Sequence, residues 1–179
     1  MTSLACPAPA YVELQVTTNF TFLRGASQPE ELVARAAELG QPAIGIADRN
    51  SLAGVVRAHV MARELAKKGK DIRIVVGARL DFTDAPSVLC YPIDRRAYGR
   101  LCCLLTTGRR RAPKGECHLT VADLCDQADG QIVIALPPEE ADWRDETFLR
   151  HLRRLKIVCG DRLYLAAQML YRGDDVRRI

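Results

Sequence analysis

Short apolar runs alternate with longer amphipathic segments along most of the chain. The runs at 43–47 and 132–136 are uninterrupted, as is typical of strands that are covered on both faces of a sheet. Segment 11–16 alternates well enough for a strand with one covered face. The pattern predicts strands at 11–16, 43–47, 72–82, 87–91 and 132–136, with weaker strand candidates at 157–159 and 163–167.

Helical spacing and helix-boundary signals predict helices between these strands. The stretch Ser27-Gln28-Pro29-Glu30 has the form of a capping box with proline just inside the helix, and Gly40 marks the end of that helix. The turn at 83–86 predicts that the strands on either side of it pair antiparallel. The alternation as a whole predicts an α/β fold with a largely parallel sheet. Further helices are expected at 51–68, 94–107, 120–130 and 139–155, with a basic loop at 108–115.

Composition narrows the class of protein. The 179 residues suit one ordinary domain, and 48% apolar with 27% charged residues is a globular mixture. Seven cysteines without a Cys-x-x-Cys pair predict reduced thiols. No stretch approaches the roughly 18 apolar residues of a membrane helix, and the start of the chain lacks signal-peptide features. We therefore expect a cytoplasmic protein with no membrane contact, in which residues 1–10 are a flexible leader and 11–179 a single domain.

Polar residues follow the first two predicted strands, in the segments 11–27 and 43–54. In β/α enzymes the residues at the carboxyl ends of neighbouring strands converge on one mouth, where the chemistry takes place. The converging residues here are mostly poor metal ligands, and Asp48 is the one good ligand among them. The set comprises Gln15, Thr17, Asn19, Arg24, Asp48 and Arg49.

The order and spacing of these segments resemble the opening motifs of the polymerase and histidinol phosphatase (PHP) domain. More narrowly, they resemble the PHP domain at the N-terminus of bacterial error-prone C-family DNA polymerases, relatives of the polymerase III α subunit. Further matching stretches lie at 76–80, 89–92, 98–101, 114–119, 134–138 and 163–166.

The resemblance implies a distorted β/α barrel, which has seven strands in PHP domains. Because the pattern supplies only about five or six strands, we expect the barrel to be truncated before closure, with the domain incomplete at its C-terminal end. An open barrel exposes strand edges, so we expect a homodimer or strand exchange to cover them.

The resemblance also implies where the family holds its metal ions. In PHP enzymes two or three ions are bound by a His-x-His, an Asp-His pair, a Glu and later ligands, and such an array neutralises phosphate and activates water. When the family pattern is aligned with this sequence, the two histidines of the His-x-His correspond to Gln15 and Thr17, and two acidic positions correspond to Asn19 and Arg24. The Asp-His pair corresponds to Asp48 and Arg49, and the Glu to Arg79.

Arginine stays protonated and cannot ligate a metal. We therefore expect no catalytic residue and no multinuclear metal site, with only Asp48 able to ligate. The arginines are expected to pair with Asp48 or Glu13 and so balance charge in place of metals. Zinc binding by Cys117 and His118 with Cys102 or Cys103 fits no standard spacing.

The leading interpretation is a catalytically silent PHP domain with a structural role or a role in contacting DNA or a partner. The resemblance implies a parent nucleotidyltransferase that uses magnesium in DNA replication, translesion synthesis and repair, together with its remaining polymerase domains, a sliding clamp and mutagenesis proteins. Weak, non-specific DNA contact is assigned to Arg109, Arg110, Arg111 and Lys114.

Two alternatives come from other classes. One is a residual metal-dependent phosphoesterase or 3′–5′ exonuclease that works through Asp48 with one zinc or manganese ion. The other is a free-standing interaction domain.

Overall fold

The computed structural model describes residues 11–138, 145–169, 171, 173 and 175–178. The expected leader at 1–10 and the first residues of the helix expected at 139–155 lie outside them. The chain forms two compact units, of which the first comprises Met1–Ile46 and Ala53–Val75 and the second Ala47–Leu52 and Val76–Ile179. None of the described helices combines the length and the apolar character that a membrane span requires.

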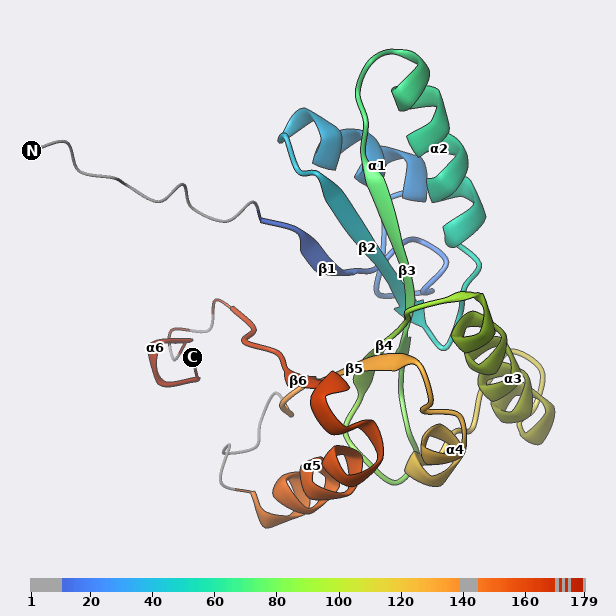
Figure 1. Ribbon diagram of the computed structural model, residues 1–179, viewed down its shortest axis with the longest axis vertical. Coiled ribbons are helices and arrows are strands. Elements are labelled where there is room, and N and C mark those ends of the chain that lie inside the picture. Colours follow the sequence, from blue (N-terminus) through green and yellow to red (C-terminus); the bar gives the residue numbers. More distant parts are fainter. Residues whose placement is uncertain (1–10, 139–144, 170, 172, 174, 179) are drawn as a thin grey trace, which may run out of the picture. The chain divides into compact units, whose positions relative to one another are not determined.

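Within the described residues, six strands form one sheet whose order follows the sequence (Figure 1). Strands β1 and β2 pair parallel, as do β5 and β6, whereas β3–β4 and β4–β5 pair antiparallel. The predicted antiparallel pair around the turn at 83–86 is confirmed. The sheet is mixed because this turn reverses the chain, so that β4 runs antiparallel to both of its neighbours. The strands are β1 Glu13–Val16, β2 Ala43–Arg49, β3 Arg73–Leu80, β4 Val88–Pro92, β5 Gln131–Ala135 and β6 Leu163–Leu165.

The first unit packs helices α1 (Pro29–Glu38) and α2 (Val55–Lys67) around a small apolar core. That core contains Val33 and Ala58, both fully buried, with Ile44 and Ile46 of β2. Helix α1 has Gln28 as its N-cap, and Glu31 accepts a hydrogen bond from the Gln28 N–H at 2.8 Å. The capping box was therefore predicted one residue too early.

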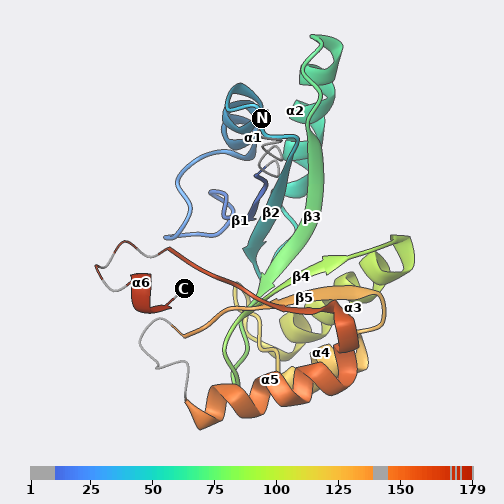
Figure 2. The ribbon, with the colours of Figure 1, turned by 60° about the vertical axis from the view of Figure 1, so that its left-hand side comes forward.

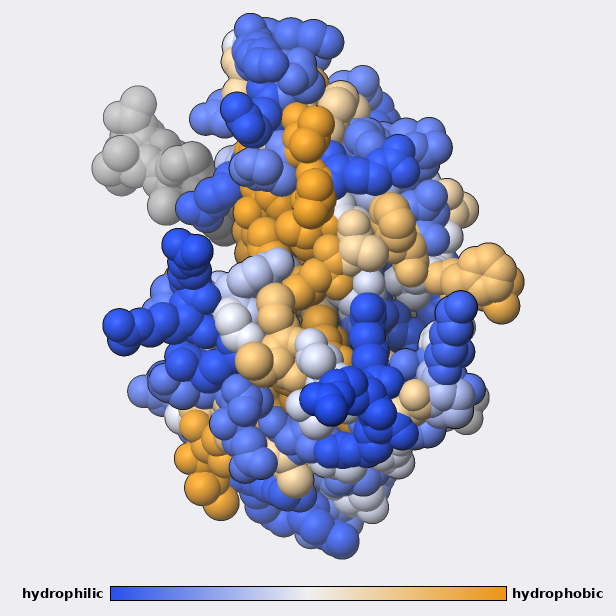
Figure 3. Space-filling view, turned by 90° about the vertical axis from the view of Figure 1, so that its right-hand side faces the viewer, coloured by the Kyte–Doolittle hydropathy of each residue, from blue (hydrophilic) through white to orange (hydrophobic). Residues whose placement is uncertain are grey.

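Helix α2 begins at Val55, not at residue 51, because 51–54 form the turn before it. Arg57 of α2 donates to Glu30 at 2.5 Å and to Gln28 at 2.7 Å, which joins α2 to the start of α1. Val56 and Val60 are exposed on α2, and Figure 3 shows apolar side chains gathered on the side of the first unit that carries this helix.

The second unit has a larger core, which includes Leu80, Leu101, Leu119 and Val133. Gln131 is buried among these apolar residues, and its amide donates to the Ala97 carbonyl at 2.7 Å while accepting from the Cys90 thiol at 3.3 Å. Helix α5 packs against β5 and β6 (Figure 2). The helices of this unit are α3 Arg95–Arg111, α4 Val121–Asp126, α5 Glu146–Cys159, the 3-10 turn η1 Gly160–Arg162 and α6 Asp175–Arg178.

Two element assignments made from the sequence were wrong in the second unit. Helix α3 does not stop at residue 107 but continues through Arg111, since arginines in the last turn favour the negative helix end. Residues 157–159 do not form a strand but complete α5, because Leu155 and Cys159 are both buried at helical spacing. Gly160, with a φ of 57°, then ends this helix. The short helix predicted at 120–130 is α4, which ends at Asp126.

Candidate functional site

The expected site positions in the first unit lie in β1 and in the turn that follows it. Gln15 and Thr17 are partly buried, whereas Asn19 and Arg24 are exposed. The backbone closes the turn, because the Asn19 N–H donates to the Ser27 carbonyl at 2.9 Å. The positions that the resemblance assigns to metal ligands therefore lie in β1 and in a turn closed by its own backbone.

Gly25 is required in this turn by a close backbone contact. A Cβ at this position would lie 2.0 Å from the Thr18 carbonyl oxygen, far inside contact distance. The Gly25 N–H donates to the Thr21 carbonyl at 3.0 Å, and Leu23 adopts a left-handed φ of 62°. Gly25 is therefore a conformational requirement of the turn.

In the second unit, two of the predicted site residues share one carboxylate that sequence reasoning missed. Arg79 of β3 donates through Nε to Asp81 Oδ1 at 2.9 Å, and Arg49 at the end of β2 forms an ion pair with Asp81 Oδ2. The Ser87 hydroxyl also donates to Asp81 Oδ1 at 2.6 Å. Arg79 and Asp81 are two residues apart along an extended chain, so they lie on the same side; this spacing was the available signal.

Asn50 holds the backbone around this carboxylate. Its N–H donates to the Arg79 carbonyl at 2.8 Å, and its side-chain oxygen accepts from the Asp81 N–H at 3.0 Å. Its own carbonyl accepts from Arg109 at 3.0 Å. Asn50 has a φ of 45°, a conformation that asparagine tolerates better than most residues. We call Arg49, Arg79, Arg109, Asn50, Asp81 and Ser87 the arginine cluster.

The arginine cluster keeps Asp81 ionised. Burial raises the pKa of Asp81, but the hydrogen bond from Ser87 and the charges of Arg79 and Arg49 outweigh it, so the pKa lies below its usual value. The two guanidinium groups that contact Asp81 carry more positive charge than its single carboxylate neutralises. An acidic residue therefore balances the charge of Arg49 and Arg79, as expected, but that residue is Asp81, which the sequence analysis did not name.

Asp48 is fully buried at the end of β2. Its proposed role as a lone metal ligand stays a prediction. Glu13 accepts from the Gln15 N–H at 2.8 Å and from the Tyr11 hydroxyl at 2.5 Å. Within the part of the chain that the structure describes, no group of three or more His, Cys, Asp or Glu side chains is placed to hold a metal ion.

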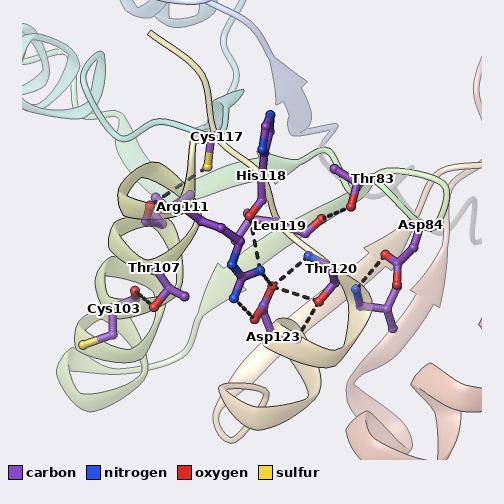
Figure 4. A network of polar contacts seen from close by, with 12 residues as sticks. Thr83, Asp84, Cys103, Thr107, Arg111, Cys117, His118, Leu119, Thr120 and Asp123 are labelled. Carbon is purple, nitrogen blue, oxygen red and sulfur yellow. Dashed lines mark hydrogen bonds and ion pairs between the residues drawn. The ribbon is translucent and has the colours of Figure 1, made fainter. Parts of the chain in front are cut away.

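The basic run assigned to DNA contact lies in the last turn of α3 and just beyond it, and the structure uses part of it internally. Arg111 makes two parallel hydrogen bonds to Asp123, at 2.8 Å and 3.0 Å (Figure 4). Arg109 belongs to the arginine cluster. Arg110 and Lys114 are exposed. Arg109 and Arg111 are exposed as well, so all four residues of the run are accessible, and two of them also make contacts within the chain.

Asp123 also caps helix α4. Its carboxylate accepts from the Thr120 N–H and hydroxyl, each at 2.8 Å. The hydrogen bond from Arg111 is the main cause that lowers the pKa of Asp123 to about 2, with further lowering by Thr120. The Cys117 thiol donates a long hydrogen bond to the Leu105 carbonyl at 4.0 Å, and Cys103 stands on helix α3 (Figure 4).

Comparisons with known proteins show the family. The sequence pattern of the PHP domain matches residues 13–163. The chain is 52% identical over 172 residues to the error-prone DNA polymerase of Caulobacter vibrioides, and 47% identical over 172 residues to error-prone DNA polymerase 1 of Agrobacterium fabrum. Each match covers 96% of this chain and 15% of the relative, so the chain spans a small part of the relatives' length.

A solved structure shares the fold. An amidohydrolase from Chromobacterium violaceum, determined with bound sulfate and no metal, superposes with a TM-score of 0.63 at 14% identity. The match covers 84% of this chain and 75% of that protein. This likeness fits the mixed sheet and helices described above. With its sequence match over most of the length, the chain belongs to the PHP domain family.

Proposed function

We propose that this chain is a catalytically silent PHP domain with a structural role in an error-prone DNA polymerase. The observation that carries the proposal is the shared carboxylate of Asp81. Two positions that resemble metal-ligand positions of the family hold Arg49 and Arg79, and both side chains contact Asp81. Guanidinium groups donate hydrogen bonds and cannot accept a metal ion, so these residues do not fit a multinuclear metal centre.

The arginine cluster supports a structural role because it can hold neighbouring strand ends as bound cations do. Asp81 receives hydrogen bonds from Arg79 and Ser87, and Asn50 fixes the backbone of both Arg79 and Asp81. The Asp81 side chain is only 15% exposed. Loss of one partner from such a half-buried group leaves charge without compensation, which is strongly unfavourable.

The role of the whole protein belongs to the same proposal, which the relatives' printed name, error-prone DNA polymerase, supports. It would act in the cytoplasm as a nucleotidyltransferase in DNA replication, translesion synthesis and repair. Magnesium chemistry would reside in polymerase domains that these 179 residues do not supply. The sliding clamp and mutagenesis proteins would be partners of that whole protein.

Metal content and phosphoesterase activity test the silent-domain proposal. The tag-free chain is dialysed against zinc or manganese, its metal content is measured by plasma mass spectrometry, and hydrolysis of p-nitrophenyl phosphate and of a 3′-labelled oligonucleotide is followed. We expect substoichiometric metal and no hydrolysis above the protein-free rate, because arginines occupy ligand positions.

The Asp48→Asn variant is the matched control for the opposite result. Stoichiometric metal with hydrolysis that Asp48→Asn abolishes would overturn the proposal and establish the residual phosphoesterase. Hydrolysis that survives in Asp48→Asn would indicate a contaminating enzyme, which a second purification step removes before the comparison is repeated.

A further inference from the structure

The turn that follows β1 displays two large apolar side chains almost completely to solvent. Phe22 is 84% exposed and the adjacent Leu23 is 89% exposed, and Phe20, two residues earlier, is 42% exposed. Single exposed apolar residues are ordinary, but neighbouring ones of this size are typical of an interaction surface. We call Phe20, Phe22 and Leu23 the apolar tip.

Hydrogen bonds hold the backbone under the apolar tip in one conformation. The Thr21 N–H donates to the Thr18 carbonyl at 2.9 Å, and the Arg24 N–H donates to the Thr21 carbonyl at 3.1 Å. Thr18 and Thr21 are both buried, so the apolar tip stands on a packed base. A preformed contact surface of this kind loses little conformational freedom when it binds.

The backbone of Leu23 is strained, and its own side chain does not offset the strain. Its φ of 62° is left-handed, which is uncommon for a residue with a Cβ, and the side chain buries almost no surface. Such conformations persist where the surrounding structure fixes them, and they cluster at functional sites. The strain therefore favours a contact made by the apolar tip.

We propose that the apolar tip is the contact through which this domain docks on the remaining part of an error-prone DNA polymerase. The inference rests on the proposed function and names the surface that serves the structural role. The sequence matches cover 96% of this chain but 15% of each relative. A whole polymerase therefore offers extensive surface outside the matched segment, and the apolar tip inserts into an apolar pocket on it.

The charge of the turn defines the rim of that pocket. Residues 17–27 contain one charged side chain, Arg24, which is exposed, and no acidic residue. A carboxylate on the rim would pair with Arg24 and fix the orientation of the apolar tip. A second copy of the chain fits less well, because a two-fold contact through the tip would bring Arg24 towards the same residue of the other copy.

Binding in trans tests the proposal with the full 179-residue chain. The chain is immobilised, and the analyte is the Caulobacter vibrioides error-prone DNA polymerase without its matching segment, purified in a form that extends a primed template. We expect the parent chain to bind this analyte. Phe22→Ala with Leu23→Ala should weaken binding about thirtyfold, because a few central anchors carry most of the binding energy of an interface. Both side chains are exposed, so the variant should keep the circular dichroism of the parent.

Leu39→Ala with Val56→Ala is the matched control, because it removes two apolar side chains that are 60% and 70% exposed in the same unit. It should bind like the parent, and a loss equal to that of the tip variant would show that only total apolar surface matters and would overturn the proposal.

The remaining outcomes separate this inference from the proposed function. If the parent binds and the tip variant binds equally well, the inference is wrong and the structural role stands. If the parent does not bind, the structural role fails together with the inference. A parent dimer in sedimentation that the tip variant dissociates would identify a second copy as the occupant and would also overturn the proposal.

Discussion

At the scale of single residues, Arg49 and Arg79 make sense only with the acid that accompanies them. Arg49 and Arg79 would repel each other and any bound cation without a carboxylate between them. Asp81 supplies it, the Ser87 hydroxyl donates to this carboxylate, and the Asn50 side chain accepts from the Asp81 backbone N–H. The sequence alone indicated that the arginines need an acidic partner, and it pointed to Asp48 and Glu13. It could not identify Asp81, because the fold decides which acid lies beside which arginine.

Removal of the shared carboxylate should cost the protein measurable stability. We expect Asp81→Asn to lower the free energy of unfolding by about 2–3 kcal/mol, because it leaves two arginines without their partner in a half-buried position. Asp129→Asn is the control, since Asp129 also pairs with an arginine, Arg100, but its side chain is 83% exposed. That change should cost less than about 1 kcal/mol. Urea unfolding of both variants makes the comparison, and equal losses would contradict a structural role for the arginine cluster.

At the scale of elements, the end of α3 and the start of α4 are joined by one ion pair. Arg111 in the last turn of α3 holds Asp123, which is also the residue that closes the α4 capping box with Thr120. The basic run looks like a ligand surface in the sequence, but its residue Arg111 instead connects helices α3 and α4. Asp123 lies 12 residues after Arg111 in the sequence. The hydrophobic periodicity does not predict the path of the turn between them, so this pair could not be predicted from the sequence.

The Asp123 contacts predict a pH dependence with a definite sign. The folded-state pKa of Asp123, about 2, lies below its unfolded value, so the carboxylate contributes stability above about pH 4. This contribution is lost as pH falls from about 4 towards 2. We expect Asp123→Asn to lower the free energy of unfolding by about 1 kcal/mol at pH 7, as for other lost caps. In denaturant titrations the difference between parent and variant should shrink as pH falls from about 4 to 2 and become small only below pH 2, because the carboxylate is still about half ionised at its own pKa. A difference that does not shrink over this range would contradict this assignment.

Other elements show where sequence patterns succeed and where they fail. The buried strand β2 and the hairpin of β3 and β4 were predictable, because an uninterrupted apolar run and a polar turn are local signals. The end of α5 was not predictable, because Ile157 and Val158 are β-branched residues that favour strands. Burial of Leu155 and Cys159 at helical spacing overrides that preference. At the end of α5, tertiary packing therefore decides the structure against the local preference for a strand.

At the scale of the whole molecule, two compact units share continuous strands. Residues of β2 and of β3 belong to both units, because the division falls after Ile46 in one strand and after Val75 in the other. The fold class and the family were predictable from motif order, whereas this division was not, since no linker composition marks it in the sequence.

Shared strands predict that the two units unfold together. Val33→Ala removes buried volume only from the first unit's core and Leu104→Ala only from the second's. Each should lower the free energy of unfolding by about 2–4 kcal/mol. If β2 and β3 couple the units, hydrogen exchange of core amides in both units should accelerate by a similar factor in either variant, because exchange there requires global opening. Acceleration confined to the mutated unit would show independent unfolding, and the structural role would then belong to the second unit, which contains the complete arginine cluster.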